Sequence, residues 1–156
     1  MKQFLTLRNV IKLGCLVLAL VAFFFMFGNQ LVLKTALGNA EVEFNDALLG
    51  DGGAILSFVG YILILAGALV ACISAFLKGS DTLKRYIVLG AALLVVLGAV
   101  FVFCEAAVFN NNHANSLGGK PNYQLTAFPI VAGILAILAG LGFGASEFVP
   151  DKALAK

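Results

Sequence analysis

Four long apolar segments separated by polar stretches dominate the pattern of hydrophobic and polar positions along this chain. They cover about residues 13–33, 54–77, 86–109 and 125–149. A helix needs about 20 mostly apolar residues to cross the roughly 30 Å hydrocarbon core of a bilayer, and each segment is long enough. Because backbone groups in lipid must be satisfied within the segment, each one is predicted to be an α-helix.

The polar stretches between these segments fit a compact arrangement. Residues 78–85 form a short polar turn, so the second and third helices are predicted to be an antiparallel hairpin. Residues 51–53 break the chain before the second helix, Pro129 suits the first turn of the fourth, and Pro150 follows its end. The sequence therefore predicts an all-α, polytopic membrane protein, with residues 1–156 forming one antiparallel bundle of four transmembrane helices.

The composition supports this class and excludes others. The chain is 62% hydrophobic and 12% charged, whereas soluble domains are about 45–50% apolar and about 25% charged. A net charge of +2 is too small to attract nucleic acid. The three cysteines do not form the even framework of a disulfide-rich secreted domain.

The distribution of Lys and Arg predicts the orientation. Only Lys34 and Lys120 fall on one side of the predicted bundle. Basic residues are enriched in cytoplasmic segments, so we expect both termini in the cytoplasm of a cell that we take to be bacterial. The other side carries eight of the ten basic residues: Lys2, Arg8, Lys12, Lys78, Lys84, Arg85, Lys152 and Lys156.

The first outer loop is acidic, and its local structure has two interpretations. Its carboxylates do not follow the EF-hand spacing, so a solvated surface is expected and no metal site is predicted. Phe44, Ala47 and Leu48 have helical spacing, but Val42 and Phe44 alternate as in a strand. The acidic residues are Glu41, Glu43, Asp46 and Asp51.

Small residues form stripes on three of the four predicted helices. In lipid, helices associate through close contact of such residues. Packing within one chain is the expected role of these stripes, and a contact with a second copy is the alternative. The first segment is rich in Phe and is expected at the periphery. The candidate packing or oligomer face comprises Gly60, Gly67, Ala71, Gly98, Gly133, Gly140 and Gly144.

Glu105 is the ionisable residue that most clearly enters a predicted span, roughly 6 Å from its outer end. Intramembrane carboxylates are costly and therefore candidate functional groups. Glu105 could reach the outer interface, bind a proton or cation, or contact another subunit. Glu147, at the inner edge, is expected to pair with Lys84 or Arg85. Candidate partners of Glu105 are Lys34, Tyr61, His113, Lys120 and Tyr123.

The remaining motifs argue against catalysis and leave two functional hypotheses. The sequence contains no Walker A, H-E-x-x-H, G-x-S-x-G or C-x-x-C motif, so it predicts no enzyme and no cofactor. Cys15, Cys72 and Cys104 are expected to be inert thiols. The leading hypothesis is a subunit or scaffold that assembles in the bilayer with itself or with other membrane proteins. The alternative is a small oligomeric channel or transporter with Glu105 near the pathway.

The layout is similar in outline to claudin- and tetraspanin-like proteins, which share four spans with both termini inside. The chain has no Trp and no Cys pair in the first outer loop. It therefore lacks the residues on which that comparison depends, and no family is assigned.

Overall fold

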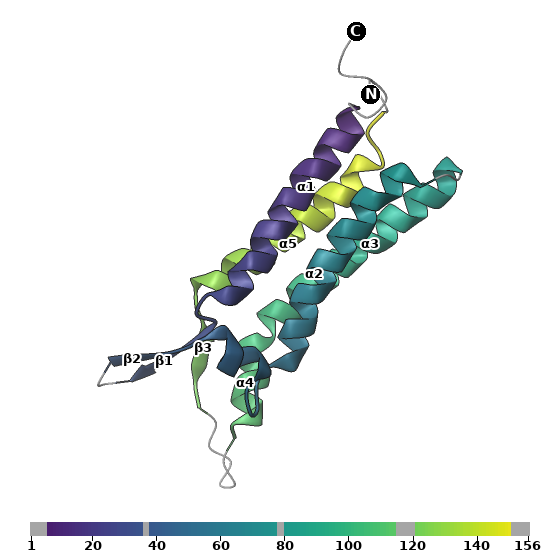
Figure 1. Cartoon of the computed structure of the whole chain (residues 1–156). Coiled ribbons are helices and arrows are strands. Elements are labelled where there is room, and N and C mark those ends of the chain that lie inside the picture. The colour runs from purple at the N-terminus through teal and green to yellow at the C-terminus, as the bar shows by residue number, and fades with distance from the viewer. Residues whose placement is uncertain (1–5, 36–37, 78–79, 115–120, 151–156) are drawn as a thin grey trace.

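Four long apolar helices run side by side in the computed structural model, which describes residues 6–35, 38–77, 80–114 and 121–150 (Figure 1). Each is long and apolar enough to cross a membrane, so the prediction of a multi-pass helical membrane protein is confirmed. One-turn 3₁₀ segments, η2 (Phe25–Phe27) and η4 (Ser74–Phe76), extend the first two. The four helices are α1 (Leu7–Phe24), α2 (Ile55–Ile73), α3 (Asp81–Phe103) and α5 (Ala127–Ser146).

The helices contact one another in a closed order. α2 packs on α3, α3 on α5, α5 on α1 and α1 on α2. Figure 1 shows that α1 begins and α5 ends at the same end of the bundle, which we name the terminal end. The opposite end carries the strands and is named the sheet end.

Three short strands join the connections at the sheet end. β1 (Leu31–Thr35) lies between β2 (Gly38–Val42) and β3 (Tyr123–Leu125), and both pairings are antiparallel. A five-residue π-helical turn, η3 (Asn45–Leu49), and the short helix α4 (Glu105–Asn112) complete this end. The sheet thereby ties the connection that follows α1 to the connection that precedes α5.

The predicted first span is wrong at both ends. The helix begins at Leu7, so Lys12 lies inside α1 and not before it. At the other end the helical segment stops at Phe27, because Gly28 takes an extended conformation with ψ of 178°. The apolar residues from Leu31 onward pair with two strands, which satisfies their backbone groups without a helix.

The third and fourth spans also differ from their predicted bounds. Ser80 accepts a hydrogen bond from the Leu83 amide at 3.3 Å and caps α3, so this helix starts at Asp81 and includes part of the predicted turn. A one-residue break at Cys104 then separates α3 from α4. Residues 78–79 of the predicted turn lie outside the described residues. α5 is shorter at both ends than predicted and keeps Pro129 in its first turn.

The first outer loop contains both of the structures that its pattern suggested. Val42 ends β2, and Phe44 precedes η3. Ala47 and Leu48 of η3 are fully buried. The strand and the short helix therefore occupy consecutive parts of the loop and are not alternatives.

Glycines bring the backbones of α2 and α3 into close contact. A Cβ atom at Gly60 would lie 2.6 Å from the carbonyl oxygen of Gly98, and one at Gly98 would lie 2.5 Å from that of Gly60. About two turns further along α2, a Cβ at Gly67 would lie 2.8 Å from the Ala91 carbonyl oxygen. Both helix backbones approach so closely here because neither carries a side chain at the crossing.

We expect Gly98→Ala to destabilise the fold by about 1–3 kcal/mol, because the new methyl group meets rigid backbone. Gly90→Ala is the matched control, since a Cβ at this exposed position of α3 meets no atom within 4 Å. Thermal unfolding of both variants in detergent tests the difference. Equal midpoints would show that the α2–α3 crossing tolerates a methyl group.

Candidate functional site

Buried polar side chains gather at both ends of the bundle. At the sheet end, Gln30, Tyr61 and Glu105 are each fully buried and form what we name the sheet-end cluster. At the terminal end, Lys12 and Glu147 form a buried ion pair. These two groups are the chemically most unusual parts of the described structure, because removing polar and charged groups from water is costly.

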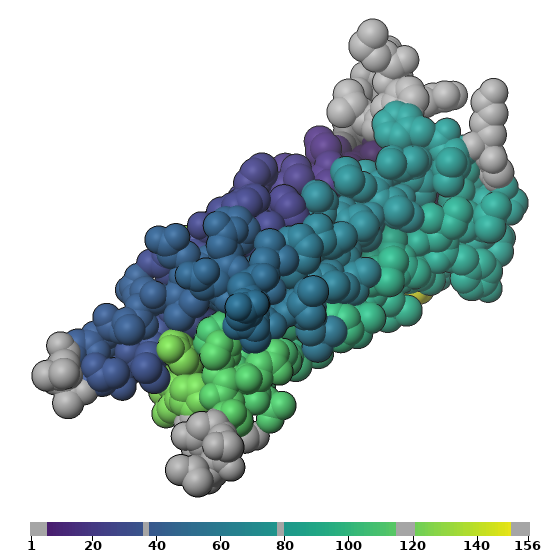
Figure 2. All heavy atoms as spheres, turned by 60° about the horizontal axis from the view of Figure 1, so that its bottom comes forward, coloured from purple at the N-terminus to yellow at the C-terminus, as the bar shows by residue number. Residues whose placement is uncertain are grey.

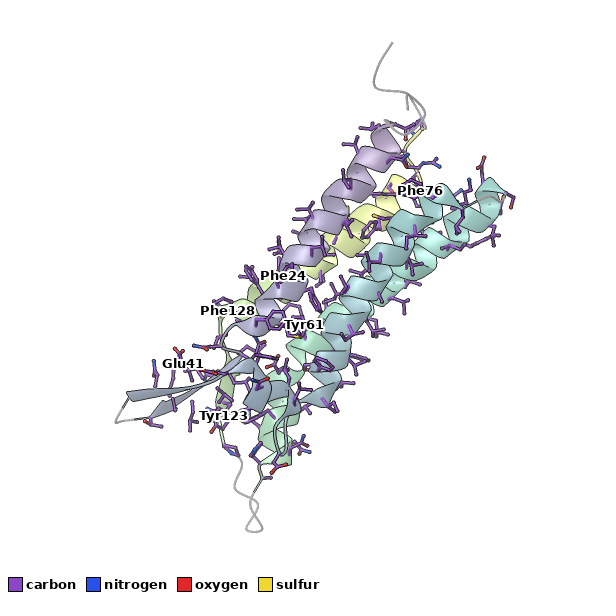
Figure 3. All side chains as sticks on the ribbon, in the orientation of Figure 1. Phe24, Glu41, Tyr61, Phe76, Tyr123 and Phe128 are labelled. Atoms are coloured by element: carbon purple, nitrogen blue, oxygen red, sulfur yellow. The ribbon has the colours of Figure 1, made fainter. Side chains whose placement is uncertain are left out.

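Gln30 holds the end of the first helical segment. Its side-chain amide donates hydrogen bonds to the carbonyls of Phe25, Met26 and Gly28 at 3.0, 2.8 and 2.8 Å. Its side-chain oxygen accepts a hydrogen bond from the Tyr61 hydroxyl at 3.0 Å, and Tyr61 lies inside the bundle near the sheet (Figure 3). One glutamine thus satisfies carbonyls that a helix end would leave unpaired.

Glu105 opens α4, two residues beyond the end of α3. Its carboxyl group is fully buried, and neither oxygen has a hydrogen-bond partner among the described residues. Tyr61 lies within electrostatic range of it. Burial raises the pKa of Glu105 to about 8, because the charged form loses its hydration. The carboxyl group is therefore mostly protonated at neutral pH.

Tyr61, one of the partners predicted for Glu105, lies close enough to interact with it electrostatically. His113 instead stacks on the Phe109 ring at a centroid distance of 4.1 Å. Its Nδ1 atom lies 3.0 Å from the Phe109 carbonyl oxygen. These contacts place the histidine in the packing of α4.

The other predicted partners have different surroundings. The backbone of Tyr123 forms two hydrogen bonds with the Asn110 side chain, at 2.8 and 2.9 Å. Lys34 is exposed on β1. Lys120 lies outside the described residues.

Glu147 pairs with Lys12 and not with the expected Lys84 or Arg85. The Lys12 Nζ atom lies 2.7 Å from the Glu147 Oε1 atom, and the two side chains are 7% and 3% exposed. Lys12 comes from α1 and Glu147 caps the C-terminus of α5, so the pair joins the two helices. Sequence reasoning missed it because the predicted span began one residue after Lys12.

The predicted small-residue face divides into close contacts and one open position. In addition to the α2–α3 crossing, a Cβ at Gly133 would meet the Phe103 ring, and one at Gly140 would lie 2.6 Å from a Val96 methyl carbon. Both are contacts of α5 with α3. A Cβ at Gly144 would meet nothing within 4 Å. The last residue of the predicted face, Ala71, is fully buried in α2.

Neither the acidic loop nor the cysteines form a further site in the described part of the chain. Glu41 accepts a hydrogen bond from the Asn29 side chain. Within the described residues, no group of three His, Cys, Asp or Glu side chains could hold a metal ion. The three cysteines are unpaired with one another, and the Cys72 thiol donates to the Lys12 carbonyl at 3.6 Å.

No protein-family model, curated protein or solved structure matches the chain. The functional inference therefore depends on the chemistry of the described residues. A buried carboxyl group such as that of Glu105 can take up and release a proton, and a buried ion pair such as Lys12–Glu147 can fix two helices relative to each other. Small apolar side chains of α3 are buried in the core between the two ends of the bundle: Val88, Ala91, Val95, Ala99 and Val102.

We expect Lys12→Met to destabilise the fold by about 3–5 kcal/mol, because it leaves the Glu147 carboxylate buried without a counter-charge. The double variant Lys12→Met/Glu147→Leu should recover most of this loss. Thermal or denaturant unfolding in detergent measures four proteins: the unmodified chain, Lys12→Met, Glu147→Leu and the double variant. If the two single losses simply add in the double variant, the ion pair is not the interaction that couples α1 to α5.

Glu105 should make stability depend on pH. Because burial raises its pKa from 4.5 to about 8, the folded protein binds more protons than the unfolded chain between these values. Stability should therefore fall as the pH rises from about 4.5 to about 8, and Glu105→Gln should remove much of this slope.

Unfolding midpoints measured across this pH range check the prediction. Glu43→Gln, which changes an exposed carboxylate of the outer loop, is the matched control. An unchanged slope in Glu105→Gln would contradict the assignment.

Proposed function

We propose that the chain is a non-catalytic subunit or scaffold of a membrane assembly, built from copies of itself or with other membrane proteins. The observation that carries this proposal is the β1–β2 hairpin. It extends sideways beyond the helices (Figure 1) and forms a projection separate from that of the α4–β3 segment (Figure 2). Residues 38–41 of β2 are exposed.

The hairpin offers a strand edge for a partner. β1 pairs on both sides, so β2 is an edge strand of the three-stranded sheet. An exposed edge presents backbone N–H and C=O groups on which another chain can add a strand. A hairpin of this kind beside a bundle with little exposed polar surface is well suited to subunit contact.

The same proposal includes the orientation of the bundle. Four antiparallel spans would place both termini in the cytoplasm of a bacterial cell membrane, with the sheet end outside. Arg8, Lys84 and Arg85 belong to the terminal end, whereas Lys34 belongs to the sheet. This distribution follows the positive-inside rule.

A small channel or transporter is the second candidate, and Glu105 is the observation that favours it. A buried carboxyl group without a hydrogen-bond partner is a natural proton-binding group. A conducting path from Glu105 would also have to pass through the core of the bundle, where the buried side chains of α3 are apolar. The subunit proposal requires no such path and is preferred.

Photo-crosslinking in native membranes tests the subunit proposal. A photoreactive residue at Asn39 on β2 should give a defined adduct heavier than the 16.3 kDa chain, identifiable by mass spectrometry. Gln124 on β3, at the opposite edge of the same sheet, is the control and should give less product. A monodisperse monomer after gentle extraction, without an adduct from Asn39, would overturn the proposal.

A further inference from the structure

A polar pocket and an apolar groove meet on the α3–α5 side of the terminal end. The pocket has a volume of about 430 Å³, and the groove has a volume of about 470 Å³. Leu89 of α3 lines both, so the two adjoin at this side chain. The groove is walled by apolar and small side chains, including Leu93 and Leu141, which are 71% and 62% exposed.

Two guanidinium groups line the polar pocket. The Arg8 guanidinium donates one hydrogen bond to the Val149 carbonyl at 3.2 Å, while its Nε atom is buried without a partner among the described residues. The Arg85 guanidinium carbon lies 4.6 Å from the centroid of the Phe148 ring. Both groups keep N–H donors for a further acceptor, since a guanidinium carries five.

The pocket has a net positive charge. It contains two carboxylates, of Asp81 and Glu147, and the latter is neutralised by Lys12 at 2.7 Å. Two arginines, Arg8 and Arg85, are therefore balanced within the pocket by the single carboxylate of Asp81. Thr82 and Tyr86, which carry hydroxyl groups, also line the pocket. The planar guanidinium group of arginine can donate two parallel N–H hydrogen bonds to the oxygens of a phosphate group.

Two glycines of α5, Gly140 and Gly144, line the groove. Gly140 packs against Val96, but a Cβ at Gly144 would meet nothing within 4 Å. The space beside Gly144 is thus unfilled by the described side chains, and α3 and α5 both line it. An apolar chain lying there would follow the helices away from the arginine pocket.

We propose that this combined site binds one anionic phospholipid of the leaflet at the terminal end. Arg8 and Arg85 hold its phosphodiester, and an acyl chain occupies the groove beside Gly144. A lipid with one negative charge balances the net charge of the pocket, and a zwitterionic lipid does not. The inference depends on the chain spanning a bilayer and is independent of the assembly proposed above.

Native mass spectrometry after reconstitution with equal amounts of phosphatidylglycerol and phosphatidylcholine tests the site. The unmodified protein should retain one phosphatidylglycerol in preference to phosphatidylcholine. Arg85→Gln should reduce this retention about tenfold, because charge-assisted hydrogen bonds to the phosphate are lost. Gly144→Leu should reduce it similarly by filling the groove.

Matched controls separate the site from general lipid contact. Gly90→Leu makes the same change at an exposed glycine of α3 that also has open space, and Lys34→Gln removes a cation at the sheet end. Both should retain the lipid. Circular dichroism checks that each variant folds. If Gly144→Leu loses its helical spectrum, lipid retention by Arg85→Gln and Arg8→Gln tests the proposal instead.

Three outcomes would overturn the proposal. One is equal retention of the two lipids by the unmodified protein. The second is unchanged retention in the arginine variants. The third is displacement of the lipid by inorganic phosphate, which would show that the groove adds nothing to binding.

Discussion

The arrangement of the sheet end depends on the hydrogen bonds of Gln30. A helix that ends in an apolar setting leaves carbonyl groups unpaired, and these must find donors inside the protein. The Gln30 side chain supplies them, while its backbone accepts from Thr126 and donates to Val42. The Tyr61 hydroxyl completes its bonding. One buried residue therefore joins α1 to the sheet, to α2 and to the start of α5.

This junction explains which part of the fold the sequence could predict. The existence of four spans follows from length and hydropathy, and these properties do not depend on tertiary contacts. The strand from Leu31 to Thr35 does depend on them, because it pairs with β2 directly after it and with residues about 90 positions later in β3. Its apolar sequence resembles the end of a helix until that partner is known.

The candidate site was predictable to a similar extent. Glu105 is identifiable from sequence as an acid in apolar surroundings, but its lack of a hydrogen-bond partner among the described residues is visible only in the folded chain. Lys12 was missed because a single basic residue near a span is ordinarily assigned to the flanking segment. Its burial requires a carboxylate on another helix, and Glu147 is 135 positions away. Long-range pairing of this kind leaves no local pattern.

Glu105 and Glu147 are both buried, and the structure compensates the loss of carboxylate hydration differently at each. Glu147 has a cation at 2.7 Å, so the charged form is compensated and the pair becomes a fixed link between helices. Glu105 has no ion-pair partner among the described residues, and burial favours its neutral form. The ion pair fixes two helices, whereas the carboxyl group of Glu105 is kept mostly protonated by burial.

The glycines of α5 show a corresponding division along one helix. Gly133 and Gly140 let α3 approach closely, which is the usual purpose of small residues in lipid. Gly144 lies one turn beyond Gly140 in the same stripe, yet among the described residues no side chain or neighbouring helix comes within 4 Å of the Cβ it lacks. A G-x-x-x-G pattern therefore does not by itself identify a helix-packing face. Here one glycine brings two helices together, and the next leaves room between them at the end where the buried ion pair and the arginines lie.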